Sequence, residues 1–203
     1  MRKWWKIALF VLCLAPALTL AWNGLHQNLG PNPVETITHT TGNWTLRLLL
    51  ITLAVTPLRK ILQRPDLIQY RRMLGLFAFF YGTLHLLTYL WLDQSFSVPA
   101  MLKDVVKRPF ITAGMTGFLS MLPLAVTSTA GWIRRIGGRN WQRLHRLIYL
   151  AATAGVVHYY WLVKSDVRLP LLYAALLTPL LAWRLVEAAR KRRPHPAAAA
   201  ALR

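Results

Sequence analysis

The sequence predicts an all-α integral membrane protein, a six-helix transmembrane bundle with both termini in the cytoplasm. Three observations predict this class. The 203-residue chain is 55% hydrophobic and 15% charged, whereas soluble domains carry about 25% charged residues. Its apolar residues fall into six blocks, each near the length that a helix needs to cross a bilayer. Its basic residues gather in alternate connections between these blocks.

The six expected spans cover about residues 7–22, 44–62, 73–92, 110–127, 145–163 and 169–186. The first span is short and follows basic residues, as a signal peptide would. Pro16 and the flanking tryptophans Trp4, Trp5 and Trp22 favour a retained helix anchored at the membrane interfaces. Residues 1–193 are expected to form one domain, with an outer loop over about residues 23–43 and a flexible tail over residues 194–203.

The basic residues predict the orientation of the bundle. With the N-terminus inside, 19 of the 25 Lys and Arg residues lie in cytoplasmic segments, which is the distribution that membrane insertion favours. The net charge of +19 is therefore interpreted as a topology signal. No nucleic-acid partner is expected, because the basic residues form short runs between apolar blocks. The six basic residues expected outside are Arg47, Lys103, Lys107, Arg108, Lys164 and Arg168.

Prolines fall within the first, second, fourth and sixth spans, at Pro16, Pro57, Pro123 and Pro179. Proline kinks a helix. The third and fifth spans lack proline, so they are predicted to be the straightest and the best suited to hold a cofactor.

The same two spans carry histidine. His85 lies 12 residues after Met73, and His158 lies 13 residues after His145, which places both about 18–20 Å along their helices. Two imidazoles at equal depth are suited to be the axial ligands of a haem iron. The alternative is a histidine hydrogen-bonded to a neighbouring helix, which suits a single histidine better than a matched pair.

Glycines precede both histidines by three residues, at Gly82 and Gly155. A residue at this offset shares the histidine's face of the helix, so a glycine there would leave room for a flat macrocycle. Close helix–helix packing is the alternative explanation.

His145 is about 20 Å from His158 along one helix and cannot bind the same iron. It is a candidate ligand of a second, inner haem iron near the cytoplasmic face, although no histidine on the third span matches its depth. Nearby arginines would either pair with haem propionates or only set the topology. They are Arg71, Arg72, Arg143 and Arg146. The remaining histidines, His26, His39 and His195, are expected to be solvated or interfacial.

These residues occur in stretches that resemble a known family. They are His85, Trp141-Gln-Arg-Leu-His145-Arg-Leu-Ile-Tyr-Leu and His158, with Thr56-Pro57-Leu58-Arg59 and Arg71-Arg72-Met73-Leu74-Gly75. The chain resembles the ferric-reductase-like transmembrane domain family. Within it, the resemblance is closest to the MsrQ (YedZ) haem-binding membrane subunits of methionine sulfoxide reductase systems, and it covers nearly the whole chain.

The resemblance implies a bacterial inner-membrane electron carrier. It implies one or two b-type haems bound by His85, His145 and His158, and FMN as a further cofactor. The partner it implies is MsrP, a periplasmic molybdopterin reductase that repairs methionine sulfoxide in oxidised periplasmic proteins. The electrons would come from the quinone pool or from a cytosolic flavin reductase.

The chain departs from the wider family in its histidines and its length. NADPH oxidases and ferric reductases usually carry two histidines on each of two helices, whereas this chain carries two and one. It also lacks their flavin and nicotinamide domains. No complete catalytic site is therefore expected. The alternatives are a stand-alone ferric or metal reductase-like cytochrome b, and a haem-free membrane transporter or assembly factor.

Overall fold

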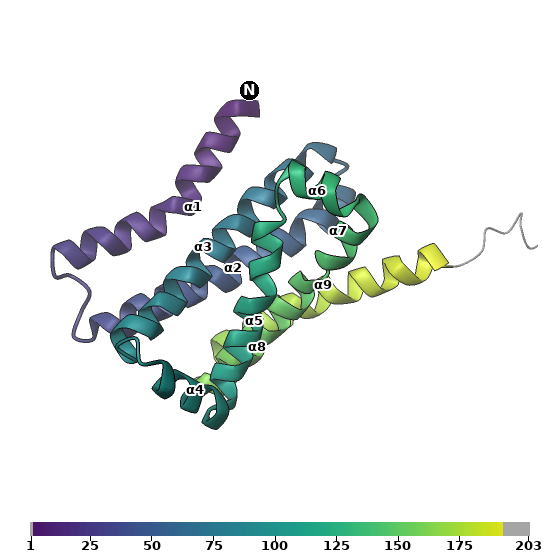
Figure 1. The fold of residues 1–203 in the computed structure, drawn as a ribbon. Helices are drawn as coiled ribbons and strands as arrows, with labels where there is room; N and C mark the ends of the chain where they lie inside the picture. Colours follow the sequence, from purple (N-terminus) through teal and green to yellow (C-terminus); the bar gives the residue numbers. More distant parts are fainter. Residues whose placement is uncertain (1, 193–203) are drawn as a thin grey trace, which may run out of the picture.

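The computed structural model describes residues 2–192, and within that range every regular element is a helix (Figure 1). This confirms the all-helical prediction. Six long helices overlap the six expected spans, and shorter ones connect them. The elements are α1 (Arg2–Leu25), α2 (Pro33–Ile61), the 3₁₀-helix η1 (Pro65–Tyr70), α3 (Arg71–Thr88), the π-helical turn η2 (Tyr89–Asp93), α4 (Val98–Lys107), α5 (Pro109–Val126), α6 (Ala130–Ile136), α7 (Gly138–Leu144), α8 (Leu147–Leu162) and α9 (Arg168–Arg192).

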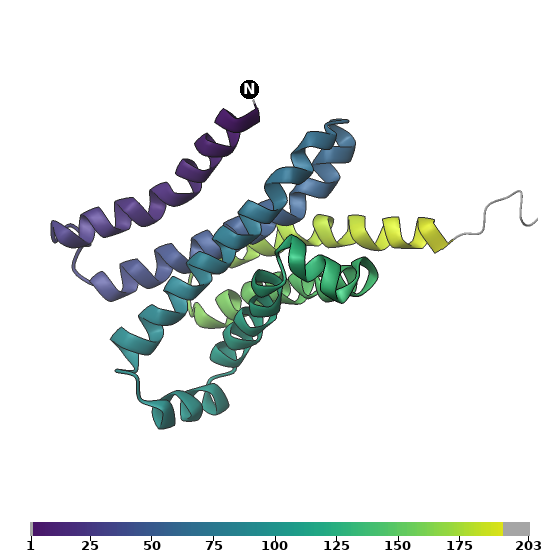
Figure 2. The same ribbon diagram turned by 45° about the horizontal axis from the view of Figure 1, so that its top comes forward.

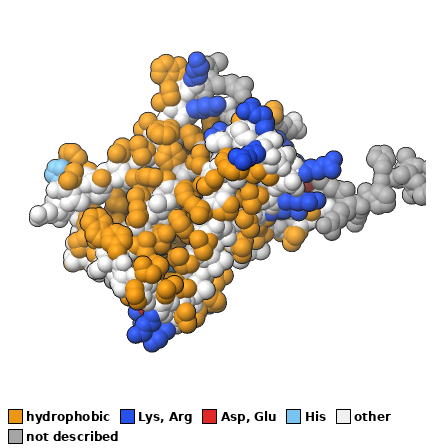
Figure 3. All heavy atoms as spheres, in the orientation of Figure 1, with side chains coloured by type: hydrophobic (Ala, Val, Ile, Leu, Met, Phe, Trp, Pro, Cys, Tyr) orange, Lys and Arg blue, Asp and Glu red, His pale blue; other side chains and the backbone are white. Residues whose placement is uncertain are grey.

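Four of the described helical stretches are long and apolar enough to cross a membrane: Lys3–Leu25, Pro65–Leu92, Pro109–Val126 and Arg168–Arg190. Of the other two long helices, α8 has only 16 residues and α2 carries three basic residues among its apolar ones. Hydrophobic side chains cover much of the visible flank, while Lys and Arg gather toward the ends (Figure 3). Exposed apolar surface of this extent marks a membrane-facing surface, so the chain is a multi-pass membrane protein.

The predicted outer loop over residues 23–43 is wrong, because α1 continues to Leu25 and α2 already begins at Pro33. Asn32 caps α2 by accepting a hydrogen bond from the backbone N–H of Glu35 at 3.3 Å. Proline is favourable in the first helical turn because it has no N–H to satisfy there. The polar residues after Pro33 therefore lie on a helix, and only residues 26–32 connect α1 to α2.

Two further features differ from the prediction. The fifth long helix, α8, begins at Leu147, and His145 lies just past the end of α7. Segments expected to be loops also contain helices, namely α4, α6 and α7. The predicted flexible tail at residues 194–203 lies outside the described residues.

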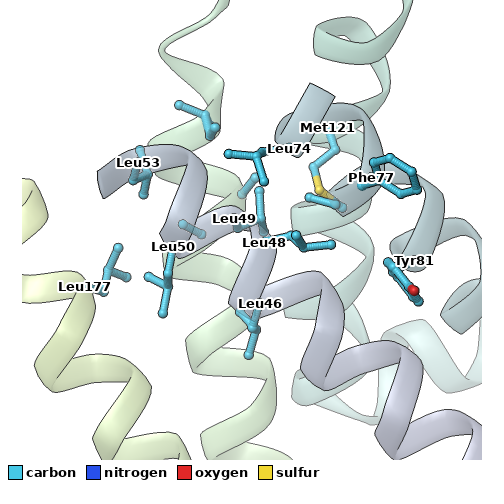
Figure 4. Close-up of a cluster of buried hydrophobic side chains, with 14 of the residues drawn as sticks. Leu46, Leu48, Leu49, Leu50, Leu53, Leu74, Phe77, Tyr81, Met121 and Leu177 are labelled. Carbon is cyan, nitrogen blue, oxygen red and sulfur yellow. The ribbon is translucent and has the colours of Figure 1, made fainter. Parts of the chain in front are cut away.

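The core lies around α2, which packs against α3 on one side and α9 on the other (Figures 1 and 2). Leu48, Leu49 and Leu53 of α2 are at most 3% exposed. They belong to one cluster with Phe77 of α3 and Leu177 of α9 (Figure 4). The long helices from the middle of the chain form two antiparallel pairs, α2 with α3 and α5 with α8.

In Figure 1, α1 stands apart from the other helices along much of its length, but one buried tyrosine connects it to α3. The hydroxyl of Tyr81 accepts a hydrogen bond from Ala17 N at 3.0 Å and donates one to Cys13 O at 2.8 Å. In an uninterrupted helix, Ala17 N would donate directly to Cys13 O. The neighbouring Pro16 disturbs this turn, and the Tyr81 hydroxyl inserts between the two backbone groups.

A second proline has a similar partner. Pro57 has no N–H, so the carbonyl of Leu53, four residues earlier, lacks its helical donor. Arg184 of α9 donates to that carbonyl from Nη2 at 3.1 Å. Pro57 thus leaves free the carbonyl that connects α2 to α9.

The substitution Tyr81→Phe should lower the free energy of unfolding by about 1–3 kcal/mol, because it leaves two buried backbone groups without their partner. Denaturant titration of the protein in detergent measures this change. Tyr160→Phe is the matched control, since the side chain of Tyr160 is 47% exposed and should change stability by less than about 0.5 kcal/mol. Equal effects of the two substitutions would show that the Tyr81 hydroxyl does not stabilise α1.

Candidate functional site

A cavity of about 310 Å³ lies between α2, α3, α5 and α8, at the lower end of the ~300–1,000 Å³ typical of ligand pockets. Its lining is mostly apolar. The residues from α2 are Thr38, His39, Gly42, Asn43, Thr45, Leu46 and Leu49; those from α3 and η2 are Gly82, His85, Leu86 and Tyr89; those from α5 and the residue before it are Arg108, Phe110, Ile111, Gly114, Met115, Gly117, Phe118 and Met121; and those from α8 are Ala151, Gly155, His158, Tyr159 and Leu162.

His85 and His158 face each other across this cavity. Their ring centroids lie 6.0 Å apart, and the ring planes are nearly perpendicular, at 81°. The prediction that the two histidines lie at equal depth on facing helices is therefore confirmed. An iron held by two imidazoles at about 2 Å would place the ring centroids about 6.3 Å apart, since each ligating nitrogen lies about 1.1 Å from its ring centre. The observed separation fits a metal between the rings.

Each histidine is held by a backbone carbonyl of the neighbouring helix. His85 Nδ1 lies 3.0 Å from Thr38 O on α2, and His158 Nδ1 lies 2.6 Å from Phe110 O on α5. Because a carbonyl only accepts, each Nδ1 carries the proton, and each Nε2 keeps its lone pair. Neither Nε2 has a hydrogen-bond partner among residues 2–192. This arrangement, with Nδ1 donating and Nε2 free, is typical of metal-binding histidines.

A glycine allows each ring to approach that carbonyl. A Cβ on Gly42 would lie 3.1 Å from His85 Nδ1, and a Cβ on Gly114 would lie 2.8 Å from His158 Nδ1. Each glycine follows its carbonyl residue by four positions, one helical turn later on the same face. The α2–α3 and α5–α8 pairs thus each present one histidine by the same local arrangement.

Gly82 and Gly155, predicted to make room for a macrocycle, both line the cavity. The space beside them contains the flexible ends of two side chains. A Cβ on Gly82 would lie 2.9 Å from Met121 Cε, and one on Gly155 would lie 2.8 Å from Leu46 Cδ2. Rotation of these two side chains would widen the cavity, so the lining, the free Nε2 atoms and the separation of the two imidazole rings together fit a haem.

His145 lies outside this cavity. Its ring stacks on Trp141, with centroids 3.9 Å apart, and its Nε2 lies 3.1 Å from the hydroxyl oxygen of Thr127. Trp141 Nε1 also donates to the carbonyl of Thr127 at 2.8 Å. These contacts attach the α7 segment to the end of α5, so the structure shows a packing role for His145, and its role as a haem ligand stays a prediction.

The four arginines predicted near His145 also lie outside the cavity. Arg71 is half-buried at the start of α3, and its charge interacts with His145 and with Arg184. The other three side chains, Arg72, Arg143 and Arg146, are exposed.

The remaining histidines have separate environments. His26 is exposed and stacks on Trp22. His39 is exposed as predicted, but it lies on α2 and lines the cavity. His195 lies outside the described residues.

Sequence reasoning missed Arg108, Gly42 and Gly114. A signal for the two glycines was present, since Gly42 precedes His85 by 43 residues and Gly114 precedes His158 by 44. These nearly equal spacings have meaning only once α2 is known to pair with α3 and α5 with α8.

Comparison with known proteins gives a consistent result. Residues 41–156 match the family described as ferric reductase like transmembrane component. The heme-binding subunit MsrQ of the protein-methionine-sulfoxide reductase of Azospira oryzae is 54% identical over 192 residues, which cover 94% of this chain and 82% of that protein. The subunit of the same name from Herminiimonas arsenicoxydans is 50% identical over 196 residues, covering 96% of this chain and 90% of that protein.

The MsrQ subunit of Caulobacter vibrioides is 50% identical over 181 residues, covering 89% of this chain and 86% of that protein. No solved structure matches the chain. The similarity to the MsrQ subunits spans nearly the whole chain, including the segment that carries His158. The chain therefore belongs to the MsrQ family of methionine sulfoxide reductase subunits, within the ferric-reductase-like transmembrane proteins.

Proposed function

We propose that this chain binds b-type haem between His85 and His158 and carries electrons across the bacterial inner membrane to a periplasmic methionine sulfoxide reductase. One observation carries the proposal. Two histidines on facing helices lie 6.0 Å apart by their ring centroids, and each directs its protonated Nδ1 to a backbone carbonyl. The names of the relatives, heme-binding subunits of such a reductase, support the same function.

Different residues of the cavity would have different roles in binding the haem. His85 and His158 would hold the haem iron through Nε2, and the carbonyls of Thr38 and Phe110 fix the orientation of both rings. Apolar side chains such as Leu49 and Phe118 exclude water from the cavity, which tunes the reduction potential. The haem itself, when bound, supplies reversible one-electron chemistry.

We propose the partner protein and the electron donors from the membership of this chain in the MsrQ family. A subunit named for a reductase needs a second protein, and we propose MsrP, a molybdopterin enzyme that reduces methionine sulfoxide in periplasmic proteins. The electrons would enter from the quinone pool or from a cytosolic flavin reductase, with FMN as a further cofactor. The excess of basic residues in alternate connections supports six membrane spans with both termini in the cytoplasm.

A second haem is proposed near His145, at the end of the bundle that carries α6 and α7. Arg71 interacts electrostatically with His145, and a cation at this place suits a haem propionate. The exposed Arg72, Arg143 and Arg146 are close to Arg71 and His145 in the sequence and would make weaker contacts of the same kind.

The test is electron transfer between purified proteins. We expect a red protein whose dithionite-reduced spectrum is that of low-spin haem b with two histidine ligands. Purified MsrP with methionine sulfoxide should reoxidise it, and neither component alone should. A colourless preparation from haem-replete cells would contradict haem binding and favour a transporter or assembly factor. Rapid reoxidation by ferric chelates without MsrP would favour a stand-alone metal reductase.

A further inference from the structure

The lining of the cavity is polar at one end only. In the antiparallel bundle, His39 near the start of α2, Tyr89 after the end of α3 and Arg108 before the start of α5 all lie toward α4. Leu49 and Met121, further along their helices, line the opposite end. The cavity is thus amphiphilic, with an apolar interior and a polar, cationic end next to α4.

Arg108 is the cation at this end, and Asp104 fixes its position. Arg108 Nε lies 3.4 Å from Asp104 Oδ1. The other carboxylate oxygen, Oδ2, accepts hydrogen bonds from Tyr89 Oη at 3.3 Å and from Gln94 Nε2 at 3.0 Å. The Asp104 side chain is only 15% exposed. Two hydrogen-bond donors, Tyr89 and Gln94, therefore fix this carboxylate, and the carboxylate pairs with one edge of the guanidinium.

The other edge of the Arg108 guanidinium is available. A guanidinium has five N–H donors, and the ion pair with Asp104 is made at Nε. No other acceptor bonds this guanidinium within residues 2–192. Lys103 and Lys107 lie on the adjoining helix α4, so the region stays positive after the single charge of Asp104 is subtracted. An anionic group at this end of the cavity would find both a favourable field and unused donors.

We propose that Arg108 binds the carboxylates of the haem in the cavity, with Asp104 as its positioning residue. This inference rests on the proposed function. Haem combines an apolar ring with two propionate carboxylates, and the cavity matches this division. The histidines and the apolar lining take the ring, and Arg108, half-exposed next to the cavity, takes the carboxylates. Charge-assisted hydrogen bonds from arginine to a carboxylate are the strong kind.

The test compares haem with haem dimethyl ester, whose carboxylates are blocked. Protein purified in detergent from haem-limited cells is titrated with each, and binding is followed by absorbance. Arg108→Gln should weaken haem binding about tenfold. Its affinity for the ester should stay within about twofold of that of the unsubstituted protein. Arg108→Lys, which keeps the charge, should recover part of the loss. The matched control is Arg168→Gln, since Arg168 is 92% exposed and outside the cavity.

Three outcomes would contradict the inference. Equal weakening of haem and ester by Arg108→Gln would mean that Arg108 supports the fold rather than the carboxylates. Unchanged haem binding in Arg108→Gln would overturn the inference and leave the proposed function intact. If the unsubstituted protein bound neither haem nor the ester, the proposed function would fail, and this inference with it.

Discussion

The substitution His158→Ala is expected to abolish the bis-histidine haem spectrum and to lower the haem content per chain at least about tenfold. The reason is geometric. His158 is one of only two described histidines whose rings face each other, and its Nδ1 is already bonded to Phe110 O, which leaves Nε2 for the iron. Without it, an iron in the cavity would keep only His85 as a histidine ligand. The absorbance spectrum of the reduced protein and pyridine haemochrome quantification measure the change, and His85→Ala should have the same effect.

Three controls separate ligation from folding. His26→Ala should change nothing, because His26 is exposed, lies just past the end of α1 and contacts Trp22 of that helix. His145→Ala should retain the spectrum of the cavity haem and remove only the haem of a second site. Adding imidazole to His158→Gly should restore the low-spin spectrum if His158 acts as a ligand. A normal spectrum in His158→Ala would refute the assignment of the site.

The long helices and the histidine pair could be predicted from the sequence because both depend on local quantities. Apolar blocks of sufficient length become helices in a membrane. A fixed rise per residue then converts sequence separation into depth, which is why His85 and His158 face each other as expected. The polar first half of α2 was missed because its Thr, His and Asn residues have low hydropathy, although Asn32 and Pro33 provided a helix-start signal.

Other features depend on which helices become neighbours, and no local pattern contains that information. The function of Gly42 and Gly114 appears only when α2 lies beside α3 and α5 beside α8. The sequence indicated only that Arg108 is one of the few basic residues on the outer side. The packing of the helices places it against the cavity. His145 was assigned to a continuous fifth helix, but the chain turns between α7 and α8 at that point.

Glycine substitutions provide a second large effect, because one added methyl group tests how the histidines are held. In Gly114→Ala, the new Cβ would lie 2.8 Å from His158 Nδ1 and 3.0 Å from its Cε1, closer than side chains tolerate. The ring must move away, which breaks its hydrogen bond to Phe110 O. Loss of such an outer partner weakens metal binding by about 10- to 100-fold, so Gly114→Ala should lose most of its haem during purification.

The same substitution at two other helical glycines forms a graded series. A Cβ on Gly42 would lie 3.1 Å from the His85 ring, whereas a Cβ on Gly75 of α3 would meet nothing closer than Thr52 Cγ2 at 3.8 Å. Haem content should therefore fall most in Gly114→Ala and less in Gly42→Ala, and stay unchanged in Gly75→Ala. Alanine should even stabilise α3 at Gly75, by up to about 1 kcal/mol. Because all three changes add the same methyl group within a helix, an equal haem loss in all three would show that general packing, and not the approach of the histidine to its carbonyl, controls binding.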